Sequence, residues 1–571
     1  MFLKKNVSNG RVFLSFVQGY RENGKVKHKT IEKIGYLDEL EKEYDDPIAH
    51  FKSVAKERNL ATPSERKLEV SLNQRLADNS SARKNLGYAI PKRIYSLLGI
   101  HTFLQNKQKH LNIEYNLNSI FSLLIYNRFL FPSSKKKAFD RRDFFFESYD
   151  FSLDDLYRSL DYFARYSESI QKYLHEKVCD IIGRDGELGY YDVTNYYFEI
   201  PYNDEDEYND KGVLIKKGFR KKGPSKEHRP DPIVQMGLLM DSNGIPMAFN
   251  IFSGGDSEKT SLLPIIRRVK KDYGLKRIIA VADRGLNTSD NTAFLAGTND
   301  DDSCGHDGYV YGQSVLSADK EFKAWVLNTE GYIHSKEVDI DGEEVIFTHK
   351  SRIYAKTIQL ENRRGKRSLK MTIYQKQMAY YSQKYAEKQK RERELVLKKA
   401  RDLIANPGKY TRATSIGAAG YINNIKFVKE TGEIPDGVKL SLKLERIAEE
   451  EKYDGYYSIV TSEKELSDQE IRDIYRGLWE IEESFKIIKS EFKARPIYLR
   501  TENHINAHFL ICFVALLILR VLEYKLDKKY PVNRIRESLI QYSCSHLDQN
   551  YYLFDYRDEI LQSIEKVFGL D

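Results

Sequence analysis

Three side chains that could act together on a phosphate or a metal ion recur at intervals of seven residues: Tyr475, Glu482 and Lys489. Seven residues make about two helical turns, so in a continuous helix the three share one stripe, with a drift of only about 20° per step. A second stripe, about 100° away, is wholly apolar and is predicted to face the core. It consists of Ile474, Leu478, Ile481, Phe485 and Ile488. Glu482 is therefore predicted at the rim of a core, between an aromatic hydroxyl and an ammonium.

A glutamate and a lysine at helical spacing also occur on ordinary solvated helix faces, so this chemistry requires matching acids elsewhere. Asp192 is one, because it interrupts the aromatic and β-branched stretch 189–200, which predicts a strand in which Asp is uncommon. Asp283 is another, because it follows the apolar run Ile278–Ala282 and precedes a Gly turn. Such a run is typical of a strand covered on both faces. Ligands of open α/β sheets gather outside the carboxyl ends of such strands.

The elements that must position these acids predict an α/β fold. Segments 233–240 and 245–252, joined by the turn Asp241–Gly244, predict a hairpin. Apolar residues between 262 and 269 have helical spacing. The expected order is strand, strand, strand, helix, strand, then a long interruption and the helix that carries Glu482.

This order of motifs resembles the DDE transposases of bacterial insertion sequences, and within them the family-four superfamily with its Tyr, Arg, Glu and Lys signature. The resemblance covers roughly residues 85 to 530 and rests on Tyr191–Thr194, Ala282–Gly285 and Trp479–Lys489, with Ser225–Asp231 in support. One position departs from the signature. Its Arg would stand third after Tyr475, where this chain has Leu478, and Arg476 points about 120° away from Glu482 on a helix.

The resemblance implies a ribonuclease-H-like catalytic core, a mixed sheet flanked by helices, with a strand-rich insertion and N-terminal helical and hairpin-like modules. It also implies that Asp192, Asp283 and Glu482 are catalytic and hold two Mg²⁺ ions, for which Mn²⁺ can substitute. Asp192 would bridge both ions, while Asp283 and Glu482 would each hold one. Tyr475 and Lys489 would grip DNA phosphates beside the scissile bond, or steady a base turned out of the stack.

Charge is consistent with a DNA partner. The chain has 92 basic and 84 acidic residues, a formal excess of +8, so the distribution matters more than the total. One stretch of seven bases, opposed locally only by Glu227, is predicted either to contact DNA or to be an ordinary solvated face. These bases are Lys216, Lys217, Arg220, Lys221, Lys222, Lys226 and Arg229. Lys135–Lys137 with Arg141 and Arg142, and the run Arg363–Arg367, are further basic clusters.

A chain of 571 residues predicts two to four domains. We expect a hairpin-like module in 1–65, a helical DNA-binding region in 66–182, the first half of the core in 183–298, a strand-rich insertion in 299–455, and the second half of the core in 456–571. Four scattered cysteines fit reduced thiols in a cytosol. The apolar run Phe509–Leu519 is too short to span a bilayer and predicts a buried helix, so no membrane partner is expected.

Together these features predict a DNA transposase that binds the terminal inverted repeats of its element, cleaves at the ends and joins the 3′-hydroxyl ends to target DNA. Its partners would be double-stranded DNA, at the element ends and the target, and a second copy of the chain in the DNA complex. Its location would be the bacterial cytoplasm, on the nucleoid when bound to DNA. Two alternatives remain open: a metal-dependent DNA endonuclease that cuts without joining, and a domesticated DNA-binding regulator without catalysis.

Overall fold

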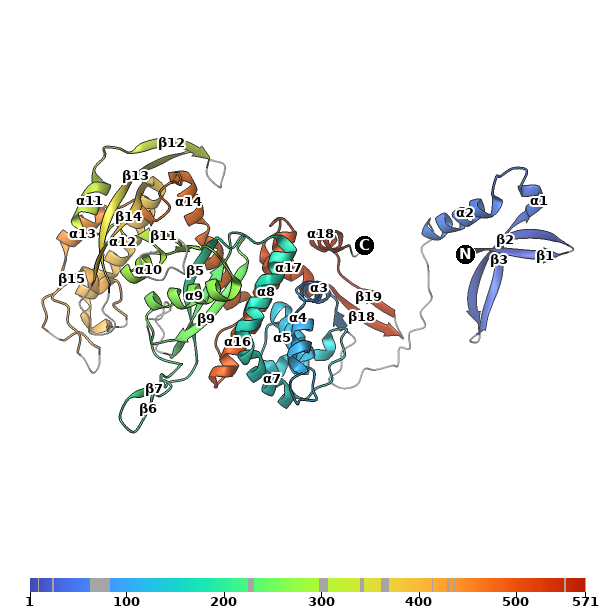
Figure 1. Cartoon of the computed structure of the whole chain (residues 1–571), viewed down its shortest axis with the longest axis horizontal. Helices are drawn as coiled ribbons and strands as arrows, with labels where there is room; N and C mark the ends of the chain where they lie inside the picture. The colour runs from blue at the N-terminus through green and yellow to red at the C-terminus, as the bar shows by residue number, and fades with distance from the viewer. Residues whose placement is uncertain are drawn as a thin grey trace. The chain divides into compact units, whose positions relative to one another are not determined.

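The computed structural model of the protein describes residues 1–8, 10–22, 25–61, 83–223, 231–296, 307–338, 344–360, 369–412, 414–428, 432–435, 437–548 and 551–569. The chain divides into two compact units, Met1–Ser80 and Ser81–Asp571 (Figure 1). Each unit has its own packing and is described separately.

The first unit is a small antiparallel sheet with two helices. Its elements are β1 (Phe2–Ser8), β2 (Arg11–Glu22), β3 (Lys25–Tyr36), α1 (Leu37–Leu40) and α2 (Pro47–Ala61). The pairing of β2 with β3 confirms the predicted hairpin, whereas β1, which pairs with β2, was not predicted. Leu14, Phe16 and Val17 on β2 are buried, and the ring of Phe16 contacts that of Phe51 on α2. The unit therefore has a core of its own.

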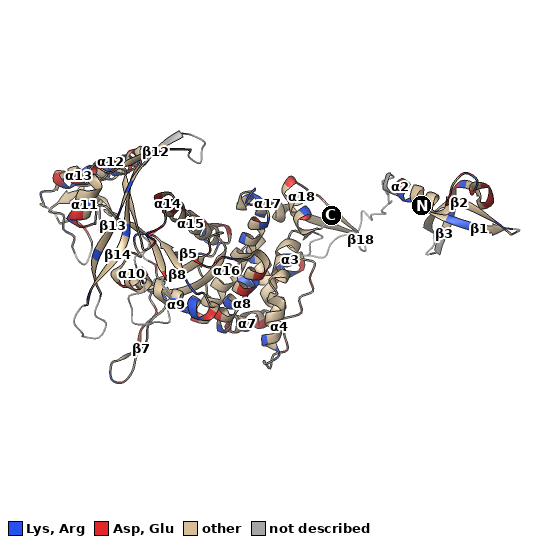
Figure 2. Cartoon of the chain, turned by 45° about the horizontal axis from the view of Figure 1, so that its top comes forward, with Lys and Arg blue, Asp and Glu red and all other residues tan. Residues whose placement is uncertain are grey.

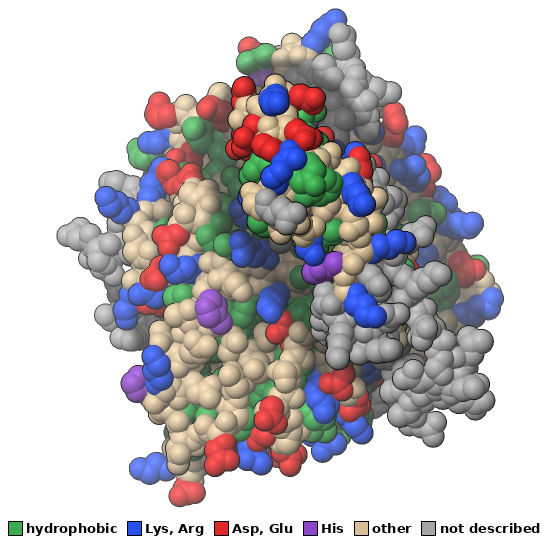
Figure 3. All heavy atoms as spheres, turned by 90° about the vertical axis from the view of Figure 1, so that its right-hand side faces the viewer, with side chains coloured by type: hydrophobic (Ala, Val, Ile, Leu, Met, Phe, Trp, Pro, Cys, Tyr) green, Lys and Arg blue, Asp and Glu red, His purple; other side chains and the backbone are tan. Residues whose placement is uncertain are grey.

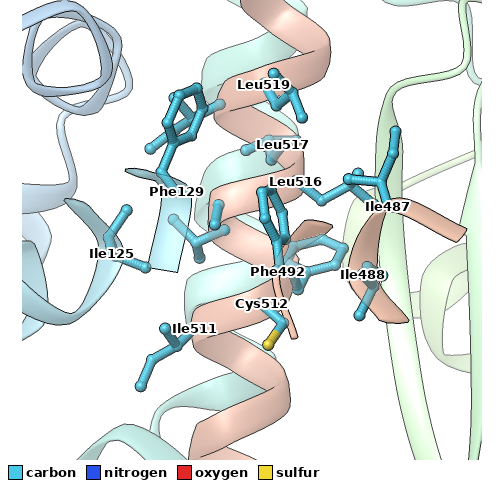
Figure 4. Packing of buried hydrophobic residues seen from close by; sticks show 14 of the residues in the cluster. Ile125, Phe129, Ile487, Ile488, Phe492, Ile511, Cys512, Leu516, Leu517 and Leu519 are labelled. Atoms are coloured by element: carbon cyan, nitrogen blue, oxygen red, sulfur yellow. The ribbon is translucent and has the colours of Figure 1, made fainter. Parts of the chain in front are cut away.

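The second unit begins with helices that surround one long apolar helix, α16 (Glu502–Lys525). In chain order they are α3 (Ala89–Leu97), α4 (Ile100–Gln108), α5 (Leu117–Leu130), α6 (Lys135–Asp140), α7 (Leu153–Arg165) and α8 (Ser167–Ile182). Helix α16 packs against α5, α7 and α3. Figure 4 shows its side chains between Ile125 and Phe129 of α5 on one side and Phe492 on the other. The helix is longer than the apolar run Phe509–Leu519, and at 24 residues it is long and apolar enough to cross a membrane, so the predicted shortness is wrong. Its burial is as predicted, because 94% of its most apolar stretch is buried in protein.

A nine-stranded mixed sheet forms the rest of the framework, in the order β12-β13-β14-β17-β11-β10-β5-β8-β9. Its strands are β5 (Leu188–Tyr197), β8 (Ile233–Met240), β9 (Pro246–Ser253), β10 (Ile279–Ala282), β11 (Gly308–Gln313), β12 (Ile333–Val338), β13 (Glu344–Gln359), β14 (Lys370–Tyr381) and β17 (Tyr456–Thr461). β5, β10 and β11 are parallel neighbours. β8 and β9 form the predicted hairpin, in which β8 pairs antiparallel with β5. The fold is thus a mixed α/β fold with a large sheet flanked by helices.

Helices cover both faces of the central strands. Helix α9 (Leu262–Tyr273) and helix α10 (Ser289–Leu295) pack on one face, where Tyr191 and Val193 of β5 point. On the other face, Tyr190 and Tyr196 share a core with α16 and with the segment that carries Glu482. Because side chains alternate along a strand, Asp192 and Thr194 point to this second face. The acid of β5 is therefore held under the Glu482 helix.

Beyond the central strands, the chain extends the same sheet instead of forming a separate one. β13 and β14 are long, and β14 pairs with β17, which pairs with β11. Helices α11 (Lys320–Leu327), α12 (Gln383–Ala405) and α13 (Leu444–Glu451) and the short strands β15 (Ile422–Asn423) and β16 (Ser441–Leu442) accompany this extension. The first half of the core was predicted to end at residue 298. β11 lies beyond that residue, yet it pairs with β10.

The C-terminal segment returns to the helical part of the unit. It contains α17 (Val532–Gln541), β18 (Ser543–Asp548), β19 (Tyr551–Phe554) and α18 (Glu559–Phe568). β18 pairs with β19 and with β4 (Arg83–Asn85), so the end of the chain and the start of the unit share a small sheet. The buried Asn85 side chain donates to the carbonyl of Leu539, 2.9 Å away. This contact ties the first helices to the last ones.

Candidate active site

The strand register brings two acids to one edge of the sheet. β5 and β10 run parallel, with Tyr191 beside Ala282. Asp192 and Asp283 are each the next residue, so they stand side by side where β10 ends, on neighbouring strands. Tyr191 and Ala282 point into the core under α9, so the residues that follow them face the other side.

The carboxylate of Asp283 is oriented by its own loop. The backbone N–H of Gly285 donates to Asp283 Oδ1 at 2.8 Å, which closes a turn of the Asx type. A Cβ at position 285 would lie 3.1 Å from the same oxygen, so a side chain there would crowd the carboxylate. The glycine after Asp283 therefore serves to keep the acid in place at the strand end.

The third acid comes from a helix that is not continuous. The sequence predicted one α-helix through Tyr475, Glu482 and Lys489, and that prediction is wrong. The segment consists of α14 (Asp468–Arg476), α15 (Leu478–Lys486) and a π-helical turn (Ile487–Glu491). The break falls at Gly477, where a Cβ would lie 2.5 Å from the hydroxyl oxygen of Tyr190. Close contact with β5 requires a glycine there.

Glu482 differs from the other two glutamates of α15 in its ion pairing. Glu480 accepts from Lys528 at 2.7 Å, and Glu483 accepts from Arg520 at 2.9 Å. Glu482 is exposed and makes no hydrogen bond or ion pair within the part of the chain that the structure describes. It is the acid on this helix whose oxygens are left available for a ligand.

Glu482, Asp192 and Asp283 line one pocket, of about 370 Å³, which we call the acidic pocket. Its other lining residues are Thr194, Leu478, Ile481, Phe485, Lys486, Lys489, Ser490 and Arg495. Carboxylates from the middle of β5, the end of β10 and helix α15 thus line the same cavity as Lys486, Lys489 and Arg495. Such a combination can hold divalent ions and a phosphate together.

Lys489 and Tyr475 lie at different distances from this pocket. Lys489 Nζ donates to Thr194 Oγ1 at 2.6 Å, so the lysine is fixed two residues beyond Asp192 on the same strand face. Tyr475 does not line the acidic pocket. Its hydroxyl reaches toward β11, since a Cβ at Gly312 would lie 2.4 Å from that oxygen. Burial, reinforced by the charges of Asp283 and Glu482, raises the pKa of Tyr475 to about 12, so the phenol stays protonated at neutral pH.

At the position of the signature Arg, Leu478 is half-buried and lines the acidic pocket. Arg476 is exposed and lies 3.7 Å from Asp473, away from the pocket. Arg495 does line the pocket, and sequence reasoning missed it. It follows Lys489 by six residues in a segment without helical periodicity, so no stripe could have indicated it.

The predicted basic stretch lies partly outside the described residues, which do not include Lys226 and Arg229. Its other members lie after the small hairpin of β6 (Glu207–Tyr208) and β7 (Leu214–Lys216) or at its end. Locally only Glu227 opposes them, but the fold supplies further carboxylates. The pairs are Lys216 with Glu502, Lys217 with Asp256, Arg220 with Asp204 and Lys221 with Asp206. Among the described members, Lys222 has no ion-pair partner in the described structure.

Two family models match parts of the chain. Residues 3–66 match the N-terminal domain of IS1634 family transposases, and residues 340–518 match a transposase DDE domain. The second match includes Glu482 and Lys489 but neither Asp192 nor Asp283. No curated protein matches the chain.

The fold, the acidic pocket and the DDE match define a class: the protein is a DDE-type polynucleotidyl transferase or nuclease. Together with the N-terminal match, the family-model hits support a DDE transposase of an insertion sequence. Its first unit corresponds to the N-terminal match, since residues 3–66 fall within Met1–Ser80.

Proposed function

We propose that this transposase binds the terminal inverted repeats of its element, cleaves at the element ends and joins the 3′-hydroxyl ends to target DNA. The observation that carries the proposal is the acidic pocket, where acids from β5, the end of β10 and α15 converge beside Lys489. The core would be ribonuclease-H-like. In support, β9, β8, β5, β10 and β11 are consecutive in the sheet, with the first two antiparallel and the last three parallel.

The donor set of the acidic pocket suits Mg²⁺ or Mn²⁺, which prefer carboxylate oxygens and keep several waters. Within the described residues, no group of three or more His, Cys, Asp or Glu side chains could hold one ion. In the proposed arrangement, Asp192, Asp283 and Glu482 together would hold the two ions, with Asp192 serving both. Bound there, divalent ions would stabilise the attacking and the leaving oxygen of the phosphodiester.

The chain's own residues would position the DNA. Lys489, held by Thr194, would present an ammonium to a phosphate beside the scissile bond, and Arg495 would offer a second cation in the same pocket. Tyr475 stays protonated at neutral pH and lies near the charges of Asp283 and Glu482. It would donate a hydrogen bond to a phosphate or to a base turned out of the stack. Lys222 is the best remaining candidate of the basic stretch, because its neighbours are already paired.

A second copy of the chain is proposed as a partner in the DNA complex, because joining two ends to one target requires two active sites. We place the protein in the bacterial cytoplasm, on the nucleoid when bound to DNA. The alternatives remain an endonuclease that cuts without joining and a regulator without catalysis. The convergence of three acids in one pocket argues against the regulator, because a regulator has no need of it.

The test uses a duplex that carries one terminal repeat, taken from the DNA flanking the gene, with Mg²⁺ or Mn²⁺. We expect the wild-type protein to nick the duplex and to transfer the 3′ end to a target plasmid. Asp192→Ala and Asp283→Ala should abolish both steps while DNA binding persists. Nicking without transfer would favour the endonuclease, and binding without nicking would favour the regulator. Cleavage that survives in either variant would refute the assignment of that acid.

A further inference from the structure

A second cavity, of about 320 Å³, adjoins the acidic pocket and shares Arg495 with it. We call it the basic pocket. Its walls come from α5, the start of α6, α7, the segment 493–499 and α16. It is lined by Arg128, Pro132, Ser133, Ser134, Lys135, Tyr157, Lys493, Arg495, Pro496, Ile497, Tyr498, Leu499 and His508. Four of these residues are cationic, and none of the described lining residues is an Asp or Glu.

Charges of both signs are mixed over much of the described structure. Basic and acidic residues are interspersed along the helices and strands (Figure 2) and over the face shown in Figure 3. Buried cations usually require a carboxylate, because desolvating an unpaired charge is costly. Several buried cations of this chain follow that rule: Arg184 pairs with Asp241, Arg520 with Glu523 and Arg393 with Asp454, each at 2.6 Å. The basic pocket instead holds Arg128 and Lys135, both buried, without an acid in its described lining.

Lys135 is held by a neutral partner. Its Nζ lies 2.9 Å from His508 Nδ1, and His508 Nε2 lies 3.1 Å from the carbonyl oxygen of Ala494. A carbonyl can only accept, so Nε2 carries the proton and Nδ1 accepts from the lysine. Burial, together with Lys135 and Arg128, holds the pKa of His508 well below its usual value. The histidine therefore orients the amine without neutralising it.

Arg128 lines the basic pocket and binds two of the loops around it. Its Nη1 donates to the carbonyl of Phe492 at 2.7 Å and its Nη2 to that of Ser133 at 3.3 Å. Its Nε is buried and has no hydrogen-bond partner among the described residues. Two loops are thus clamped around a buried arginine and a buried lysine. The described lining of the cavity therefore combines these two buried cations with no carboxylate.

We propose that the basic pocket binds a backbone phosphate of the DNA whose scissile bond lies in the acidic pocket, with Lys135 as the principal contact. This inference rests on the proposed function for the identity of the anion. The shared Arg495 makes the two pockets neighbours, so one strand can place successive phosphates in both. Phosphate suits the site because the lining offers guanidinium, ammonium and hydroxyl donors.

Ionisation gives the proposal a specific consequence. Burial, with repulsion from Arg128 and a smaller opposing effect of Cys512, lowers the pKa of Lys135 to about 7. Arg128 of α5 and His508 and Cys512 of α16 are the groups that face the amine from the packed helices. A bound phosphate stabilises the ammonium, so binding above the free pKa takes up a proton. Affinity should therefore fall as pH rises above about 7.

The test is calorimetric titration of the full chain with the terminal-repeat duplex at about pH 8, in two buffers of different ionisation enthalpy. Lys135→Gln is the informative variant, because its amide can still donate to His508 Nδ1 but cannot take up a proton. Lys136→Gln is the matched control, since Lys136 is the next residue, is exposed and does not line the pocket. Thermal unfolding of each variant checks that it folds.

We expect the wild type and Lys136→Gln to take up about one proton each on binding. Lys135→Gln should take up none, bind about tenfold more weakly and lower the slope of log affinity against log salt by about 0.9. The inference is wrong if both variants cleave DNA and also bind it with the same proton uptake, affinity and salt slope. The proposed function would then still stand. A second titration uses inorganic pyrophosphate. If pyrophosphate binds in a Lys135-dependent way while no duplex binds, the pocket serves a free phosphate compound, and both the DNA assignment and the proposed function fail.

Discussion

Two adjacent glutamates on α15 should respond in opposite ways to the same substitution. Glu482 faces the acidic pocket and has no partner among the described residues, whereas Glu483 accepts from Arg520. Replacing either by Gln removes one charge and keeps the shape of the side chain. The pair is therefore a matched test of which acid takes part in catalysis.

For Glu483→Gln we expect a small loss of stability and nearly normal cleavage. Arg520 is buried, but it keeps Glu523 at 2.6 Å and the Ser484 hydroxyl at 2.8 Å. Glu483 is 35% exposed, so water screens its share of the interaction. The expected cost is about 0.5–1 kcal/mol, or a fall in melting temperature of about 1–3 °C.

For Glu482→Gln we expect the reverse. No interaction within the described structure is lost, so stability should change by less than about 0.5 kcal/mol. Changes to groups that merely support a metal ligand cost about 10- to 100-fold in metal affinity or activity, so loss of a ligand itself should slow cleavage at least about 100-fold.

The assay is single-turnover cleavage of end-labelled terminal-repeat duplex, with saturating enzyme and Mg²⁺, alongside thermal unfolding. Glu480→Gln adds a second control, because Glu480 is occupied by Lys528. If Glu483→Gln proves inactive while Glu482→Gln still cleaves, the acids of α15 have been assigned to the wrong faces of the helix. Equal loss in both variants would mean that the helix, and not one carboxylate, is what cleavage requires.

Three further outcomes are expected. Gly312→Ala places a methyl group 2.4 Å from the Tyr475 hydroxyl oxygen and should displace that side chain. Cleavage should then slow by up to about 100-fold, whereas a near-normal rate would show that Tyr475 needs no fixed position. Lys222→Ala should lower the slope of log affinity against log salt for duplex binding by about 0.9. Lys221→Ala should lower it less, because Lys221 already pairs with Asp206. The same slope in both variants would contradict this prediction. Light scattering should show two protein copies with two DNA ends, and complete strand transfer by one copy on one end would refute paired assembly.

Much of the central sheet follows from local patterns. The apolar run Ile278–Ala282 and the aromatic stretch around Asp192 each predict a strand, and the structure has both, as β10 and β5. The turn Asp241–Gly244 predicts the β8–β9 hairpin, and the structure has it. These features depend on side-chain alternation and turn chemistry within a few residues.

The Glu482 segment shows where such patterns stop. Heptad spacing assumed one continuous α-helix, but Gly477 ends α14 where the chain passes the hydroxyl of Tyr190, and a π-turn follows Lys486. Buried Ile481 and Phe485 on α15, and buried Ile488 in the π-helical turn, agree with the predicted apolar stripe. Tyr475 leaves the stripe and turns toward β11.

Residue type and periodicity are local properties of the chain, and they identify the side chains suited to catalysis and the strands and helices that carry them. Tertiary packing selects the side chains that meet. It pairs Glu480 and Glu483 with cations, whereas Glu482 lines the acidic pocket. It also pairs most of the described basic stretch with carboxylates. Finally, it brings Lys135, Arg128 and Arg495 together from distant segments. Partners hundreds of residues apart are chosen by packing, and the free energy of a charge depends on those partners more than on its own neighbours in sequence.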